Sequence, residues 1–329
     1  MIIAEVGSVH DGSLGNALKL IDIASECKAE YVKFQLHIAD EETLEQAPNP
    51  SYFKSENRYE YFSRIQFTNS EWVKIIKYCK KKRINFLCSI FSKAALYKLI
   101  KLGVKNIKIP SGEVNNLPLL HELNKNKNLK IFLSTGMSSW KEIDQALGVL
   151  KHKNIVLMQC TSLYPCPTKL VGLNIIKEMQ KRYGKKYKYG FSDHTTGYEA
   201  ALCSLVLGVK YIEKHITFSK KMYGSDAQFA MEPDDFKNFC DSLYKSKIML
   251  NSKVNKDNLR PFKKMKMVFE KNVVAKKIIP KGKKISMSDL DFKKTGNGVK
   301  ASKFKYFLGK RSRRRIDKNE LMRKNFVST

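Results

Sequence analysis

Hydrophobic residues in the first 250 positions form short apolar runs that alternate with longer amphipathic stretches. The runs are rich in isoleucine, valine, phenylalanine and tyrosine, which is typical of strands. Strands are predicted over 2–6, 31–35, 85–88, 106–109, 131–134, 156–159, 189–192 and 211–215. Helices are predicted near 14–27, 70–82, 92–102, 117–124, 138–150, 171–182, 198–207 and 234–248. Because few polar residues interrupt the strands, we expect burial on both faces, as in a parallel sheet.

Strand–helix alternation of this kind predicts an α/β fold, a (β/α)8 TIM barrel over residues 1–250. An open doubly wound sheet also alternates strands and helices, but the absence of a GxGxxG turn argues against it. The segment 37–66, after the second strand, is predicted to be a large loop at the barrel mouth. Loops of that length are often functional.

The pattern changes after position 250. Residues 251–265 are polar and are predicted to be a linker, and 266–329 are predicted to form a small β-rich module with strand-like runs at 272–279 and 284–286. A module of this size buries a small core, so we expect it to dock or to oligomerise.

The chain is strongly basic, with 62 lysines and arginines against 31 acidic residues. Residues 251–329 alone hold 25 basic and 6 acidic residues. A nucleic-acid or polysaccharide-binding barrel is therefore an alternative from a different functional class. Against it, the tail has no RNP-like or zinc-finger spacing and few aromatic residues among its lysines, so we do not expect a nucleic-acid partner.

The cysteines and the hydropathy of the chain indicate the cellular compartment of the protein. The 7 cysteines are scattered without a CxxC pair, which indicates reduced thiols. No apolar run approaches the about 20 residues that a membrane-spanning helix needs. We expect a cytoplasmic protein without a membrane partner.

Polar side chains follow the predicted strands. His194 lies just after the strand 189–192 and His215 ends the strand 211–215. If 198–207 is a crossover helix, both imidazoles lie at the barrel mouth, where they suit a divalent metal. Lysines, hydroxyls and carboxylates at the other strand ends suit a phosphate and a carboxylate. These residues are Glu5, Lys33, Gln35, Ser89, Lys108, Ser111, Glu113, Ser134, Ser162, Ser192 and Glu213.

The segments that carry these residues resemble the N-acetylneuraminate (sialic acid) synthase family, which includes legionaminic and pseudaminic acid synthases. The matching segments are IAEVGSVHDG at 3–12, VKFQ at 32–35, IKIPSGE at 107–113, LSTGM at 133–137, CTSLYP at 160–165, GFSDHT at 190–195 and IEKH at 212–215. The module 266–329 resembles the antifreeze-like (SAF) domain that ends these chains.

The resemblance implies condensation of phosphoenolpyruvate (PEP) with the aldehyde of an N-acetylmannosamine-type sugar. The products would be a nonulosonic (sialic) acid and phosphate, with cleavage of the C–O bond of PEP. The alternative is the same chemistry on a 6-deoxy diacetamido sugar, as in legionaminic or pseudaminic acid synthases, or on a 6-phosphorylated sugar. By the same resemblance His194 and His215 would hold Mn²⁺, Mg²⁺ or Co²⁺, which would polarise the aldehyde.

The resemblance also implies roles for the other residues. Glu113 would orient the attacking water, and Glu5 would place or protonate the sugar oxygens. PEP would be held by Lys33, Lys108, Ser89, Ser111, Ser134, Ser162 and Ser192. The sugar would face Gln35, Phe91, Tyr164 and Asp226, together with Lys294 from the C-terminal module. In a domain-swapped homodimer, that module would cover the barrel mouth of the other subunit.

Three positions depart from the family pattern. The segment 88–91 reads CSIF where a Ser-Thr-Pro-Phe type is usual, and Lys294 stands where many members have an arginine. Ala230 lacks a hydroxyl that some members carry nearby. These changes cluster around the sugar, so the reaction class is expected to hold while the sugar stays open.

Overall fold

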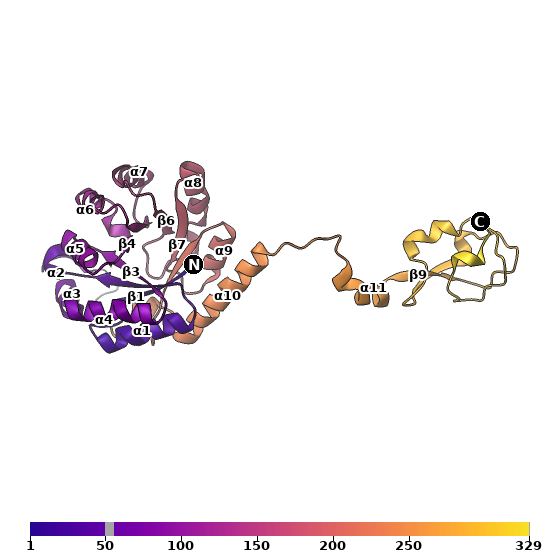
Figure 1. Ribbon diagram of the computed structural model, residues 1–329, viewed down its shortest axis with the longest axis horizontal. Helices are drawn as coiled ribbons and strands as arrows, with labels where there is room; N and C mark the ends of the chain where they lie inside the picture. Colours follow the sequence, from indigo (N-terminus) through magenta and orange to yellow (C-terminus); the bar gives the residue numbers. More distant parts are fainter. Residues whose placement is uncertain (50–55, 329) are drawn as a thin grey trace. The chain divides into compact units, whose positions relative to one another are not determined.

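The computed structural model describes residues 1–49 and 56–328 of the chain. Within them, eight parallel strands close into a barrel in chain order. Figure 1 shows several of these strands at the centre of the ring of helices. The strands are β1 (Ile2–Gly7), β2 (Tyr31–Leu36), β3 (Asn85–Ile90), β4 (Asn106–Ile109), β5 (Lys130–Ser134), β6 (Ile155–Cys160), β7 (Lys188–Asp193) and β8 (Tyr211–His215). The predicted TIM barrel is confirmed.

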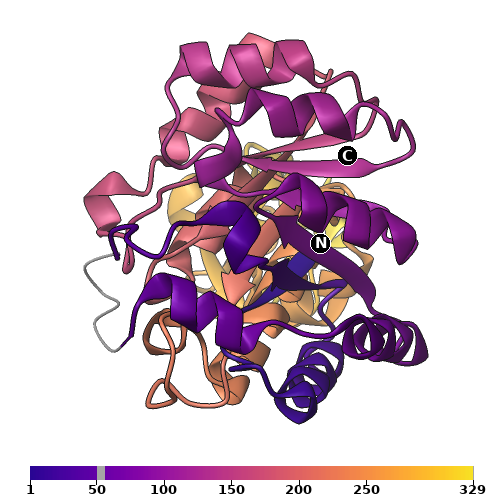
Figure 2. The same ribbon diagram turned by 90° about the vertical axis from the view of Figure 1, so that its left-hand side faces the viewer.

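Helices follow the strands and surround the barrel (Figures 1 and 2). They are α1 (Leu14–Glu26), α4 (Asn69–Lys81), α5 (Lys93–Lys101), α6 (Leu117–Leu123), α7 (Trp140–Val149), α8 (Leu173–Tyr183), α9 (Glu199–Val206) and α10 (Pro233–Asn251). Reciprocal capping boxes begin two of them: Thr68 with Glu71 at α4, and Ser139 with Glu142 at α7.

The segment 37–66 corrects the prediction of a loop. Its described part holds two short helices, α2 (Ala39–Glu42) and α3 (Arg58–Ile65), and its residues 50–55 lie outside the described residues. Asn57 caps α3 by accepting a hydrogen bond from the amide of Tyr59 at 2.8 Å. Tyr61 and Ile65 are buried, so α3 packs its apolar side inward.

The lower half of the barrel interior is apolar. Tyr31, Phe132 and Tyr211 pack edge to face there, with the rings of Phe132 and Tyr211 5.1 Å apart. At the amino end of β5, Lys130 Nζ donates to the hydroxyls of Tyr31 and Tyr211, each at 2.8 Å. Aromatic rings and this one lysine fill the amino end, and the lysines and glutamates of the cavity lie at the carboxyl ends of the strands.

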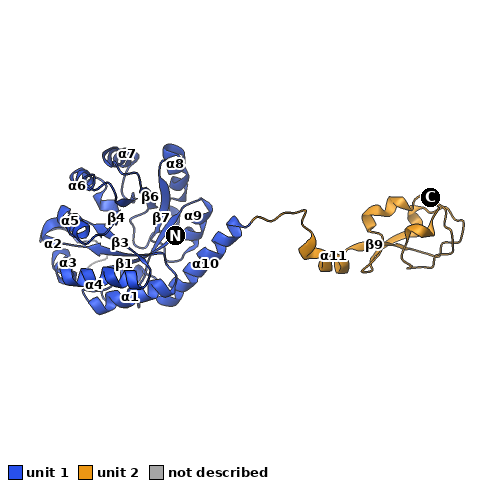
Figure 3. Cartoon of the chain, viewed as in Figure 1, with its two compact units in different colours: residues 1–252 blue, residues 253–329 orange. Residues whose placement is uncertain are grey.

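The chain divides into two compact units, residues 1–252 and 253–329 (Figure 3). The second unit contains α11 (Lys263–Phe269) and an antiparallel pair, β9 (Lys271–Ala275) and β10 (Leu290–Lys294). Its own core is formed by Val273, Ala275, Ile279, Ile285, Leu290, Phe307, Ile316, Met322 and Val327.

The small β-rich module is therefore confirmed, with differences in detail. The predicted run 272–279 ends as a strand at Ala275, and the run 284–286 is represented by an isolated bridge between Lys284 and Arg311. Among all described residues, no helix is both long enough and apolar enough to cross a membrane.

Candidate active site

A cavity of about 530 Å³ opens at the carboxyl ends of the barrel strands, and every strand contributes a side chain to its wall. The cavity brings together most of the predicted site residues. These are Glu5, Lys33, Gln35, Ser89, Phe91, Lys108, Ser111, Ser134, Ser162, Tyr164, Ser192, His194, His215 and Asp226.

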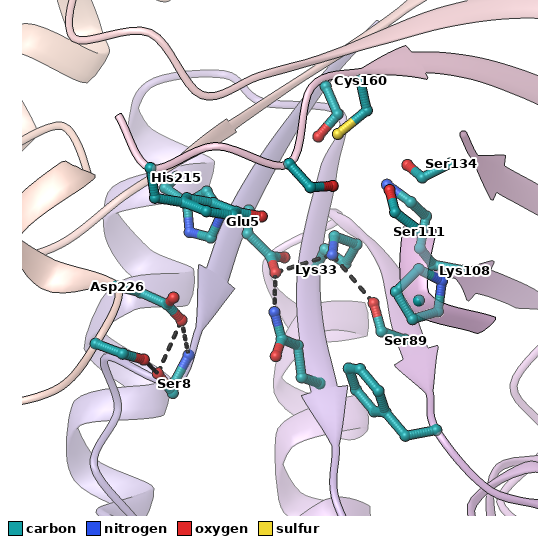
Figure 4. A pocket seen from close by; sticks show the side chains of 18 of the residues that line it. Glu5, Ser8, Lys33, Ser89, Lys108, Ser111, Ser134, Cys160, His215 and Asp226 are labelled. Atoms are coloured by element: carbon teal, nitrogen blue, oxygen red, sulfur yellow. Dashed lines mark hydrogen bonds and ion pairs between the residues drawn. The ribbon is translucent and has the colours of Figure 1, made fainter. Parts of the chain in front are cut away.

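Two lysines and two glutamates form a buried charged layer at the cavity floor. Lys33 Nζ lies 2.8 Å from Glu5 Oε1 and donates to Ser89 Oγ at 3.1 Å, as Figure 4 shows. Lys108 Nζ donates to both oxygens of Glu213, at 2.8 and 3.0 Å. Lys33 Nζ also lies 3.6 Å from Glu213 Oε1, so this carboxylate joins the two lysines.

Strand register sets this layer. Neighbouring strands align Glu5 with Lys33, Ser89 with Lys108 and Ser192 with Glu213. Alternate residues of a strand point to opposite faces of the sheet, and residues aligned on neighbouring strands point to the same face. These aligned pairs therefore all point into the barrel interior. Ser192 Oγ donates to Glu213 Oε1 at 3.0 Å, which adds β7 to the layer.

Burial and charge act against each other on these groups. Burial alone would raise the pKa of Glu213, but Lys108 and Lys33 outweigh it and lower this pKa to about 2. Burial would lower the pKa of Lys33, yet Glu213 and Glu5 raise it. For Lys108 burial prevails and lowers the pKa, and for Glu5 burial prevails and raises it. The carboxyl of Glu5 is thus easier to protonate than that of Glu213.

His194 and His215 lie side by side at the ends of β7 and β8, with ring centroids 5.8 Å apart. His194 Nδ1 lies 2.9 Å from the carbonyl oxygen of Thr161 and donates to it. Burial would lower the pKa of this ring, but Cys160 and the Thr161 carbonyl outweigh it and raise the pKa. Burial lowers the pKa of His215 to about 4, so this ring is neutral. Its Nδ1 is buried and has no hydrogen-bond partner among the described residues.

Another part of the wall joins loops from distant points of the chain. Asp226 Oδ2 accepts hydrogen bonds from the amide and the hydroxyl of Ser8, each at 2.8 Å (Figure 4). The ring of Tyr164 lies 4.2 Å from that of His194. Gln35 Nε2 donates to Glu5 Oε1 at 2.7 Å.

Two predicted site residues do not line this cavity. Glu113 ends a short 3-10 helix, Ser111–Glu113, and its carboxylate accepts a hydrogen bond from Asn116 Nδ2 at 2.7 Å. Lys294 belongs to the second compact unit, where its Nζ lies 5.1 Å from the ring centre of Phe269.

Several residues that line the cavity were given no individual role from the sequence. Glu213, which the sequence places among the polar residues at the strand ends, lines the cavity two residues before His215 on β8, as strand alternation indicates. Cys160 also lines the wall, 3.8 Å from His194 Nδ1; burial would raise its pKa, but His194 and Lys108 lower it. His37, Arg58 and Phe62 come from the segment predicted to be a loop.

Comparisons with known proteins agree with this geometry. The NeuB family model matches residues 20–255, and the SAF domain model matches residues 271–328. The N,N'-diacetyllegionaminic acid synthase of Campylobacter jejuni is 35% identical, with 98% of both chains covered. The human N-acetylneuraminate-9-phosphate synthase is 30% identical over 89% of this chain and 82% of its own length.

Solved structures give the same picture. The N-acetylneuraminic acid synthetase of Leptospira borgpetersenii, in complex with citrate, is similar with a TM-score of 0.68 and 26% identity. The match covers 82% of this chain and 91% of that one. The resemblance that the sequence motifs predict is confirmed. The chain therefore belongs to the NeuB family, and it is a PEP-dependent enzyme of the sialic acid synthase type.

Proposed function

We propose that the barrel cavity condenses PEP with the open-chain aldehyde of a 6-deoxy diacetamido hexose, releasing phosphate and a nonulosonic acid. The observation that carries the chemistry is the buried layer of Lys33, Lys108, Glu5 and Glu213 at the cavity floor. It combines two cations for an anionic substrate with a carboxyl whose raised pKa suits it to hold a proton.

In this proposal the lysine end of the cavity binds PEP. Lys33 and Lys108 hold its phosphate and carboxylate, together with the hydroxyls of Ser89, Ser111, Ser134, Ser162 and Ser192, all of which line the wall. Ser134 Oγ supports this assignment because it is buried without a hydrogen-bond partner among the described residues. A donor of that kind is stabilised by an anion.

The reaction then balances as follows. C3 of PEP bonds to the aldehyde carbon, and the aldehyde oxygen takes up a proton, for which Glu5 is the donor. Water adds at C2, and one of its protons returns to Glu5. As the C2–O bond to phosphate breaks, the new C2 hydroxyl gives its remaining proton to the departing phosphate and becomes a keto group. Glu113 keeps the role of orienting this water that the family resemblance implies; it does not line the cavity itself, but it directly follows Ser111 and Gly112, which do.

The histidine pair fits a divalent metal. Both rings line the cavity, His215 Nδ1 is buried without a hydrogen-bond partner among the described residues, and imidazole nitrogens are ligands that suit Mn²⁺ and similar ions. The described residues contain no cluster of three or more His, Cys, Asp and Glu side chains arranged for a metal, so only the two imidazoles are proposed as protein ligands. When bound, the ion would polarise the aldehyde as a Lewis acid.

The choice of acceptor rests on the relatives. Proteins named N,N'-diacetyllegionaminic acid synthase match at 35% identity in Campylobacter jejuni and 30% in Legionella pneumophila. Aromatic rings of Phe62 and Phe91 line the cavity and would contact the methyl group of a 6-deoxy sugar. N-acetylmannosamine, the acceptor favoured by the sequence analysis, and a 6-phosphorylated sugar become the alternatives.

The C-terminal SAF domain completes the proposal. It would act as a lid that excludes water, with Lys294 contacting the sugar from the partner subunit of a domain-swapped homodimer. The basic surface and the cytoplasmic location stay predictions from the sequence.

An acceptor panel tests the proposal. Phosphate release from PEP would be measured with Mn²⁺ and, in turn, the 6-deoxy diacetamido sugars, N-acetylmannosamine and its 6-phosphate. We expect release with a 6-deoxy diacetamido sugar at a kcat/KM at least about tenfold above the others. Preference for N-acetylmannosamine or its phosphate would overturn the acceptor, and no release with any sugar would count against the enzyme activity itself.

A further inference from the structure

His37 lies at the cavity wall, between two aromatic rings, and has no role in the function proposed above. Its imidazole stacks on Phe62 at 3.9 Å between centroids with a 7° tilt, and on Phe91 at 4.3 Å with a 19° tilt. Its side chain is 4% exposed, although it belongs to the segment between β2 and α2. A ring held on both faces has little rotational freedom, so its two nitrogens point in fixed directions.

Both ring nitrogens of His37 face oxygen atoms. Nδ1 lies 2.6 Å from Glu42 Oε1, and Nε2 lies 3.0 Å from Gln35 Oε1. Gln35 is in turn tied to the charged layer, because its Nε2 donates to Glu5 Oε1 at 2.7 Å. The hydrogen-bonded chain therefore runs from Glu42 through His37 and Gln35 to Glu5.

The geometry fixes which end of the Gln35 amide faces which neighbour. Glu5 Oε1 already accepts from Lys33 at 2.8 Å, so it is an acceptor whether or not the other oxygen of Glu5 carries a proton. The amide must therefore turn its NH₂ group to Glu5 and its oxygen to His37. In the reverse orientation two acceptor oxygens would face each other.

The same assignment of donors and acceptors determines which nitrogens of His37 carry a proton. Glu42 Oε1 and Gln35 Oε1 are both acceptors, so Nδ1 and Nε2 must both donate, and the ring is an imidazolium. The Glu42 carboxylate supplies the opposite charge in direct contact. Asp226 interacts with His37 at longer range, His10 is a nearby neutral ring, and the Arg58 guanidinium lies 5.8 Å from the ring centre of Phe62.

We propose that His37, as an imidazolium held by Glu42, is a positioning residue that locks the Gln35 amide and thereby determines which group of the acceptor sugar this amide binds. The proposal rests on the proposed function, in which Gln35 faces the acceptor. With one N–H of the amide bonded to Glu5, the second N–H is the donor left for the substrate. The site thus selects a sugar oxygen that accepts a hydrogen bond, such as an N-acetyl carbonyl.

The protonation state is tested without substrate, on the full chain labelled with ¹⁵N-histidine at neutral pH. His37→Asn identifies the His37 signals. We expect both ring nitrogens of His37 to carry a hydrogen in the wild type, and Glu42→Gln to convert the ring to a single N–H tautomer. A single N–H tautomer in the wild type would overturn the proposal.

Kinetics test the positioning. His37→Asn and Glu42→Gln should each raise KM for the acceptor about tenfold, as expected for a lost hydrogen bond, while KM for PEP and kcat change less than about twofold. Glu41→Gln, an exposed carboxylate on the same helix, is the matched control and should behave as the wild type. If His37→Asn does not fold, Glu42→Gln carries the test alone.

The outcomes separate the two proposals. An unchanged acceptor KM in a folded variant, or an equal rise for PEP, would overturn the positioning role and leave the enzyme activity standing. A wild-type protein that turns over no acceptor would overturn the proposed function, while the NMR spectrum would still decide the state of His37.

Discussion

Glu213 is the residue on which the charged layer depends most. Its carboxylate is bonded by Lys108, lies within ion-pair distance of Lys33 and accepts from Ser192. All three charged side chains are at most 4% exposed. Removing one member of such a buried network leaves the remaining charges without an opposite charge. The resulting loss in the free energy of unfolding is larger than the net stabilisation that the intact ion pair provides.

Glu213→Gln should therefore destabilise the barrel. We expect a loss of about 3 kcal/mol in the free energy of unfolding, because two buried ammonium groups would lose their shared counter-charge. Urea unfolding followed by tryptophan fluorescence measures it, since the two tryptophans, Trp72 and Trp140, both lie in the barrel. Glu122→Gln is the control and should change little, because its partner Lys125 is 64% exposed and water screens the pair. A loss below about 1 kcal/mol for Glu213→Gln would contradict the account.

His10 makes a separate prediction about pH. Burial lowers its pKa to about 3 from 6.5, its Nδ1 accepts from the amide of Gly12 at 3.1 Å, and its ring packs on Phe67 at 4.4 Å. Between these two values the unfolded chain binds a proton that the folded chain does not. The free energy of unfolding should therefore fall as the pH decreases from 6.5 towards 3.

His10→Asn should remove that contribution. Its unfolding free energy, measured in urea between pH 6.5 and 4.5, should depend on pH less steeply than that of the wild type, by up to about 1.4 kcal/mol per pH unit. A variant with the wild-type slope would show that His10 is not held neutral by the fold.

At the scale of elements, helix caps can be read from the sequence and tested singly. Ser139 Oγ donates to Glu142 Oε2 at 2.8 Å and accepts from the Glu142 amide at 3.4 Å, which satisfies the first turn of α7. Ser139→Ala should lower the free energy of unfolding by about 1 kcal/mol in the same urea assay. Ser138→Ala, one residue earlier and outside the capping box, should have a smaller effect. Equal losses would argue against the cap.

The strands were predictable because each is a short local run of apolar, β-branched and aromatic residues. Alternation on β8 places Tyr211, Glu213 and His215 on one face, and parallel register then aligns Glu213 with Ser192. The segment 37–66 was not predictable in the same way. Its helices α2 and α3 are short, and the stacking of His37 between Phe62 and Phe91 joins residues that no local pattern connects.

The same distinction explains the site. Residues at strand ends, such as Lys33 and Lys108, reached the cavity as predicted from the barrel alone. Asp226 reached it through a loop contact with Ser8. The family resemblance implied a site role for Asp226, and the periodicity did not. Glu113 turned to Asn116, because a neighbouring amide offers its carboxylate a direct hydrogen bond.

At the scale of the whole molecule, the two units have separate cores. In the function proposed above, the lid over each barrel comes from the partner subunit. Subunit mixing distinguishes the possibilities. His215→Ala disables the barrel site and Lys294→Ala disables the lid, so each variant alone should be nearly inactive. In a domain-swapped dimer, a mixed pair combines the intact barrel of one chain with the intact lid of the other.

Co-refolding the two variants in equal amounts should then recover about a quarter of wild-type activity, because half of the dimers would be mixed and each would carry one intact site. Activity that never exceeds the mean of the two separate variants would contradict a lid supplied by the partner subunit.

The most direct test of the central claim follows one oxygen atom. PEP labelled with ¹⁸O at the bridging position would be turned over with the preferred acceptor, and the phosphate and sugar acid analysed by mass spectrometry. Condensation with C–O cleavage predicts that all label appears in phosphate, in an amount equal to the sugar acid formed. Unlabelled phosphate with the label in a pyruvate-derived oxygen would mean P–O cleavage, and it would contradict the chemistry assigned to this cavity.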